Sequence, residues 1–62
     1  MSANIKTIEE IRDLIMEATT KNKLDACWAY VVKHKHKYPL KDISNIRILI
    51  SVKEIINVLN GF

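Results

Sequence analysis

The chain has 62 residues, a formal net charge of +3 at pH 7 and 48% hydrophobic residues. A chain of this length forms one domain at most, residues 1–62, and it is marginally stable because it buries only about 60% of its unfolded surface. The single cysteine excludes an intrachain disulfide, and no apolar run reaches the roughly 18 residues of a transmembrane helix. We therefore expect a cytoplasmic protein with no membrane contact and no cofactor, whose stability depends on packing or self-association.

The composition favours a folded core, because isoleucine is abundant and only one glycine and one proline occur. Isoleucine, lysine and asparagine also have A/T-rich codons, a compositional association that fits the genomes of many bacteriophages. We therefore expect a phage-encoded protein, on composition alone.

The first predicted helix covers residues 8–20. Thr7 and Glu10 have the spacing of a capping box, in which each side chain bonds to the other residue's backbone amide. Apolar residues then recur at helical spacing, at Ile8, Ile11, Ile15 and Ala18, bordered by Leu14. The acidic residues of this segment occupy the other side, which we interpret as a solvated face.

The second predicted helix runs from Lys23 to an end between residues 34 and 37. Four residues repeat with helical spacing in it: Leu24, Cys27, Trp28 and Val31. Pro39 disfavours helical geometry at Tyr38 and therefore limits the helix. All four repeating residues are interpreted as core, although a half-exposed Trp28 would be an interface anchor.

The third predicted helix spans residues 43–60. Asp42 or Ser44 can cap its start, and Gly61 suits the C′ position after its end. The expected core arc holds Ile48, Leu49, Val52, Ile55, Ile56 and Leu59. Ile46, Ile50 and Val58 lie outside that arc. A helix that is apolar on so many sides is buried on more than one, so we expect these three to bind a partner, and a second copy of the chain is the natural cover.

Together these segments predict an all-α, three-helix domain that self-associates as a homodimer. The alternative is an α+β fold in the order helix, strand, strand, helix. Residues 30–38 and 46–52 also alternate in the manner of strands, and the segment 39–45 would join them. The helical spacing favours the first fold, and the alternation keeps the second as its rival.

A cluster of basic residues precedes the third segment. It contains Lys33, Lys35, Lys37 and Lys41 with His34 and His36, and Tyr38 lies beside it. No acidic residue interrupts the cluster, so it is a solvated helix end, a contact patch for an acidic protein, or a phosphate-binding surface on which Tyr38 stacks on a base. Metal binding by His34 and His36 requires the strand alternative, in which both point to one face, and no metal site is predicted.

Catalytic residues are not predicted. On a helix, Cys27 and His34 lie about 10 Å apart along the axis, too far for a nucleophile–base pair, and a single glycine leaves no phosphate-binding loop. We expect a non-enzymatic protein-interaction module that regulates, inhibits or links a larger protein, using the three surplus apolar residues and the four lysines. The alternative is a small basic nucleic-acid-binding protein that contacts phosphates through the whole basic cluster.

Overall fold

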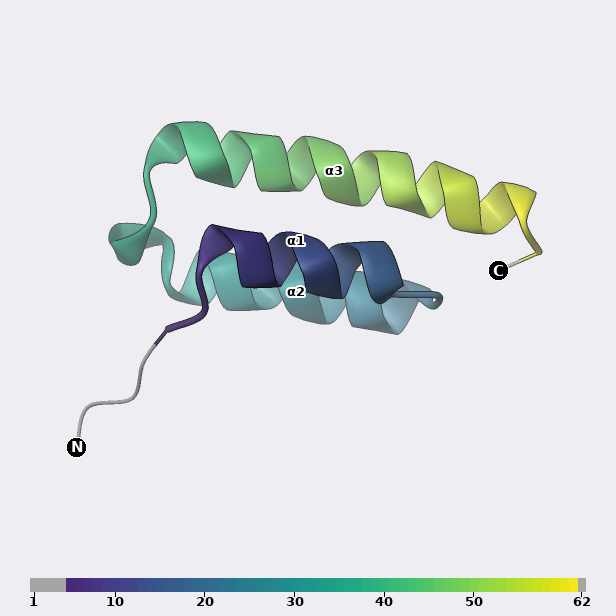
Figure 1. Ribbon diagram of the computed structural model, residues 1–62, viewed down its shortest axis with the longest axis horizontal. Helices are drawn as coiled ribbons and strands as arrows, with labels where there is room; N and C mark the ends of the chain where they lie inside the picture. Colours follow the sequence, from purple (N-terminus) through teal and green to yellow (C-terminus); the bar gives the residue numbers. More distant parts are fainter. Residues whose placement is uncertain (1–4, 62) are drawn as a thin grey trace.

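The computed structural model describes residues 5–61, which form three α-helices and one short 3-10 helix (Figure 1). In chain order these are α1 (Ile8–Glu17), α2 (Lys21–Lys33), η1 (Lys35–Lys37) and α3 (Leu40–Leu59). No strand occurs among these residues, so the all-α prediction is confirmed and the α+β alternative is wrong. No helix in the described part is long and apolar enough to cross a membrane.

α1 begins at the predicted capping box. The Glu10 amide donates to Thr7 Oγ1 at 3.1 Å, and the Thr7 amide donates to Glu10 Oε1 at 3.1 Å. The helix ends earlier than predicted, because Ala18 adopts an extended backbone and Thr20 caps α2 instead. Side-chain caps thus fix the starts of both short helices.

The connection between α2 and α3 is a tight corner. α2 ends at Lys33, just before the predicted window, and η1 continues the chain for one 3-10 turn. Tyr38 then adopts an extended backbone, as expected for a residue that precedes a proline. The corner places the whole basic cluster at one end of the molecule (Figure 1).

α3 begins earlier than predicted. Its N-cap is Pro39 with no side-chain capping bond, so the prediction of Asp42 or Ser44 as N-cap is wrong. Asp42 lies in the first turn instead, where a carboxylate interacts favourably with the helix dipole. At the other end Gly61 follows the C-cap Asn60 with φ of 81°, so the predicted C′ glycine is confirmed.

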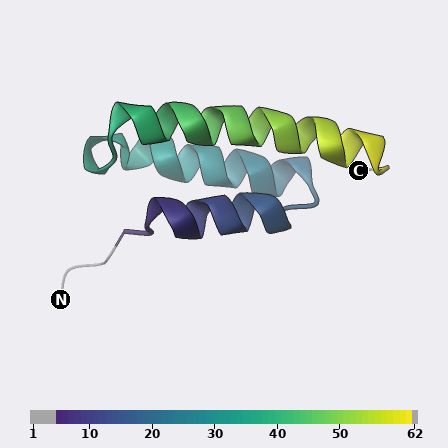
Figure 2. The same cartoon turned by 45° about the horizontal axis from the view of Figure 1, so that its top comes forward.

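The core lies where the three helices meet (Figure 2). Its fully buried side chains come in pairs from each helix: Ile11 and Ile15, Leu24 and Val31, and Ile46 and Ile50. Asn57 is also buried, and its Nδ2 donates to the carbonyl oxygen of Ala18 at 3.1 Å. This bond pairs a buried amide with a carbonyl at the end of α1, so neither group is left unsatisfied.

Two tyrosine hydroxyls hold the segment that precedes α1. The Lys6 amide donates to Tyr30 Oη at 2.9 Å, and Tyr38 Oη donates to the Lys6 carbonyl oxygen at 2.7 Å. The Lys6 ammonium also lies 4.9 Å from the centroid of the Tyr30 ring, in cation–π geometry. Both backbone polar groups of Lys6 are thereby bonded, one to α2 and the other to the corner.

α3 is longer than the helices against which it packs. At 1.5 Å per residue its 20 residues span about 30 Å, whereas the 10 residues of α1 span about 15 Å. Figure 1 shows the C-terminal end of α3 projecting past both other helices. Val58 and Leu59, beyond the Asn57 bond, are consequently 64% and 80% exposed.

Candidate interaction surfaces

The buried side of α3 is not the one that the sequence predicts. Ile46 and Ile50 are 0% and 1% exposed, so they belong to the core and are unavailable to a partner in the folded protein. Their assignment to a partner-binding surface is therefore wrong. Val58, the third residue of that prediction, does lie on the surface.

Two polar residues explain this difference. The buried strip of α3 begins with Ile43, Ile46 and Ile50 and continues through Lys53 and Asn57. In the sequence, Lys53 and Asn57 make this side of the helix resemble a solvated one. In the structure, Asn57 bonds to the end of α1, and half-buried Lys53 keeps its ammonium within reach of water along a long apolar stem.

The outward side of α3 is an exposed apolar surface, which we call the α3 outer face. It consists of Ile48, Val52, Ile55, Ile56, Val58 and Leu59, and all six are exposed. Uncharged Ser44, Asn45, Leu49 and Ser51 complete this side between residues 44 and 59, and exposed Lys41 lies in line with it in the first turn of the helix. The charged residues Arg47 and Glu54 lie on a flank of the helix instead. A contiguous apolar surface of this kind is typical of an interaction site.

The spacing along the α3 outer face is that of a helix–helix contact. Ile48, Val52, Ile55 and Leu59 follow one another at intervals of 4, 3 and 4 residues. Packed helices use this alternation as their common seam, because it keeps one stripe of side chains facing the partner. A second helix is therefore the element whose shape fits this surface.

The structure exposes most residues of the predicted basic cluster to solvent and buries the others at least in part. Exposed residues around the corner are Lys33, Lys35, His36, Lys37 and Lys41. His34 is half-buried, and its ring centroid lies 4.5 Å from that of Tyr30. Tyr38 is buried with its hydroxyl bonded to Lys6, so the prediction that it stacks on a base is wrong. Within residues 5–61 no group of three or more His, Cys, Asp or Glu side chains has the placement of a metal site.

A groove beside the corner combines apolar and basic side chains. Its volume is about 490 Å³, and its lining consists of Trp28, Val32, Lys35, His36, Leu40 and Ile43. We call it the basic-rimmed groove. Trp28 is half-buried in it, and the guanidinium carbon of Arg47 lies 5.4 Å from the centroid of the indole ring. The sequence does not reveal this groove because α2, η1 and α3 all contribute to it.

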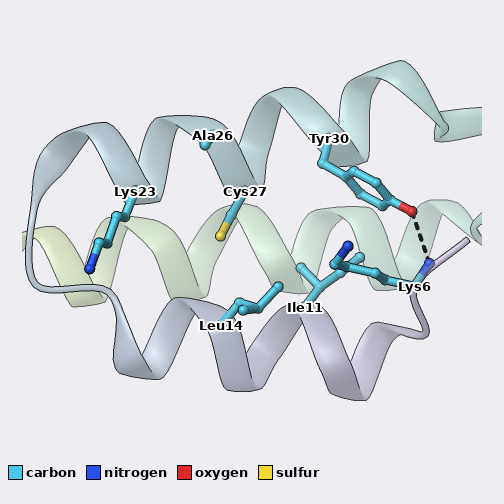
Figure 3. Close-up of a pocket in the computed structure, with 7 residues that line it drawn as sticks. All are labelled: Lys6, Ile11, Leu14, Lys23, Ala26, Cys27 and Tyr30. Carbon is cyan, nitrogen blue, oxygen red and sulfur yellow. Dashed lines mark hydrogen bonds between the residues drawn. The ribbon is translucent and has the colours of Figure 1, made fainter.

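A further apolar pocket of about 320 Å³ lies between α1 and α2 (Figure 3). It is lined by Lys6, Ile11, Leu14, Lys23, Ala26, Cys27 and Tyr30. Burial raises the pKa of the Cys27 thiol, and the nearby positive charge of Lys6 opposes only part of this increase. A thiol with a raised pKa is mostly protonated near neutral pH and reacts slowly, which supports the interpretation of Cys27 as a packing residue.

Comparisons with protein-family models, with curated proteins and with solved structures found no match for this chain. The α3 outer face and the basic-rimmed groove are the two surfaces on which a function can be proposed.

Proposed function

We propose that this protein is a non-enzymatic, cytoplasmic interaction module that dimerises through the α3 outer face and, as a dimer, regulates, inhibits or links a larger protein. The observation that carries the proposal is the exposed, uncharged stripe of Ile48, Val52, Ile55 and Leu59 on α3. Burial of such a stripe against a like surface removes apolar area from water without burying a charge.

A second copy of the chain is the occupant that the chemistry of the face favours. Two-fold pairing sets the same surface patch of each copy against the other, so the uncharged stripe meets an uncharged stripe, while Arg12, Asp42 and Glu54 border the face. Burying a half-exposed Ile, Val or Leu side chain stabilises by roughly 1 kcal/mol. Two copies together gain on the order of 10 kcal/mol, similar to the cost of association, so we expect micromolar rather than nanomolar affinity.

The Ile55→Glu variant tests this proposal. Ile55 is 62% exposed near the middle of the face, and glutamate is a good helix former, so the variant should keep its fold. Each protomer would then place a carboxylate in an apolar contact, which should weaken the dimer more than tenfold. Sedimentation equilibrium from micromolar to millimolar concentration measures the dissociation constant, with circular dichroism as the check of helicity.

Met16→Glu is the matched control. Met16 is 54% exposed on α1, away from the α3 outer face, so the same new charge should leave the dimer unchanged. The proposal fails if the wild-type chain stays monomeric at every concentration, or if both variants dissociate to the same extent.

The competing proposal is that the protein binds nucleic acid through the exposed lysines of the corner, Lys33, Lys35, Lys37 and Lys41. The absence of any carboxylate between Asp25 and Asp42 supports it. Such contacts to phosphates would be non-specific and would weaken steeply with salt. An oligonucleotide titration at two salt concentrations therefore separates this proposal from protein binding through apolar contacts.

A further inference from the structure

Exposed apolar side chains line the basic-rimmed groove, although the groove lies away from the α3 outer face. Leu40 is 82% exposed and Val32 is 45% exposed, and both border the half-buried Trp28. Large apolar side chains gathered in this way are typical of an anchor site for a partner's side chain. The indole of Trp28 supplies a rigid wall for such an anchor.

The rim of this groove is basic, so its charge is complementary to that of an acidic ligand. Lys35 and His36 line the groove, and the guanidinium carbon of Arg47, which is outside this lining, lies 5.4 Å from the centroid of the Trp28 ring. No acidic residue lines the groove. Asp42, the carboxylate in the first turn of α3, lines a different cleft beside α1. A ligand with carboxylates around an apolar anchor would therefore meet complementary charge and shape.

We propose that the basic-rimmed groove binds an acidic amphipathic segment of a partner protein. An apolar side chain of the segment packs on Trp28, Val32 and Leu40, and neighbouring carboxylates pair with Lys35 and Arg47. An amphipathic helix presents both groups at once, since its apolar anchors recur every three or four residues. A nucleic-acid backbone fits less well, because its phosphates would lie against the aliphatic side chains of Val32 and Leu40.

This inference goes beyond the proposed function, because it assigns a second surface and a different class of partner. It holds for a monomer as well as for a dimer. In a dimer formed through the α3 outer face, each copy carries one groove, and two linked grooves bind a bivalent partner more tightly than either groove alone.

The intrinsic fluorescence of Trp28 reports directly on the groove, since Trp28 is the only tryptophan in the chain. The probe is a synthetic amphipathic peptide in which leucines at helical spacing alternate with glutamates. Titration should give a saturable blue shift of the Trp28 emission as the indole loses water contact. A peptide of the same charge with serine in place of leucine, and a single-stranded oligonucleotide, should bind at least tenfold more weakly.

One variant removes an apolar contact of the groove and another reverses a charge on its rim. Two matched variants elsewhere serve as controls. Leu40→Ser removes an exposed anchor contact, and Lys35→Glu reverses a rim charge; each should weaken peptide binding at least fivefold. Met16→Ser alters an exposed apolar residue on α1, outside both proposed surfaces, and Lys21→Glu reverses a charge at the far end of α2. Neither control should change peptide affinity.

Several results would overturn the inference. If the serine peptide bound as tightly as the leucine peptide, binding would depend on charge alone. If the oligonucleotide bound more tightly than the leucine peptide, the surface would be a nucleic-acid-binding one. An unchanged Trp28 emission at millimolar peptide, or equal affinities for Leu40→Ser and wild type, would exclude the groove. Sedimentation of the same samples reports separately on the α3 outer face, so failure of the groove and failure of the dimer are distinguishable.

Discussion

The thiolate form of Cys27 would be the strongest side-chain nucleophile in the chain, but the surroundings of Cys27 disfavour that form. The side chain is half-buried and points into the pocket between α1 and α2, near Leu14 and Ile11 (Figure 3). Burial raises the pKa of the Cys27 thiol, and the charge of Lys6 offsets part of this effect. Since the thiolate is the reactive form, the local packing makes Cys27 a structural residue.

We expect iodoacetamide to alkylate Cys27 more slowly in the folded chain than in the urea-unfolded chain near neutral pH. The midpoint of the pH–rate profile should lie higher when the chain is folded, because burial disfavours the thiolate. The folded state correspondingly loses stability as the pH rises above the ordinary thiol pKa. Mass spectrometry of timed samples measures the rate. Lys6→Gln should raise the midpoint further, and a folded midpoint below the unfolded one would contradict this account.

Among the helices, α3 has two apolar sides in different environments, one in the core and one exposed to solvent. Ile50 faces the core and Ile48 faces outward, two residues away. Ile50→Ala should destabilise the fold by about 2–5 kcal/mol, a large part of the roughly 3–9 kcal/mol expected for a domain of this size. Ile48→Ala should cost less than about 1 kcal/mol. Urea unfolding at low concentration, where the dimer is dissociated, compares the two; equal losses would contradict the assignment of the sides.

The helices could be predicted because their signals are local. The capping box of Thr7 and Glu10, the proline at position 39 and Gly61 each act within a turn of their own position. The buried side of α3 could not be predicted in this way. It depends on how far the shorter α1 reaches along α3, which decides that Asn57 meets the end of α1.

The candidate surfaces could be predicted only in part. Val58 and the exposed lysines of the corner lie on the surface as the sequence indicates, whereas Ile46 and Ile50 do not. Tyr38 is withdrawn from the basic cluster by its bond to the segment before α1, a contact between residues far apart in the chain. Only the packed structure could show that Trp28 and the basic corner share one groove.

At the scale of the whole molecule, two short helices cover one side of a long one. The molecule is elongated, with extents of 41 × 24 × 16 Å, and Figure 2 shows α3 running the length of the other two helices. One helix pair cannot surround a third helix that is apolar on nearly every side. The uncovered side is the α3 outer face, and we propose that a second copy of the chain covers it.

An isotope-filtered NOE experiment tests this dimer contact directly, on a mixture of labelled and unlabelled chains at a concentration where the dimer predominates. We predict NOEs between the methyl groups of Ile48, Ile55 or Leu59 in one copy and the α3 outer face of the other. Methyl groups with only intramolecular NOEs, or intermolecular NOEs confined to Val32 and Leu40 in the basic-rimmed groove, would contradict this proposal.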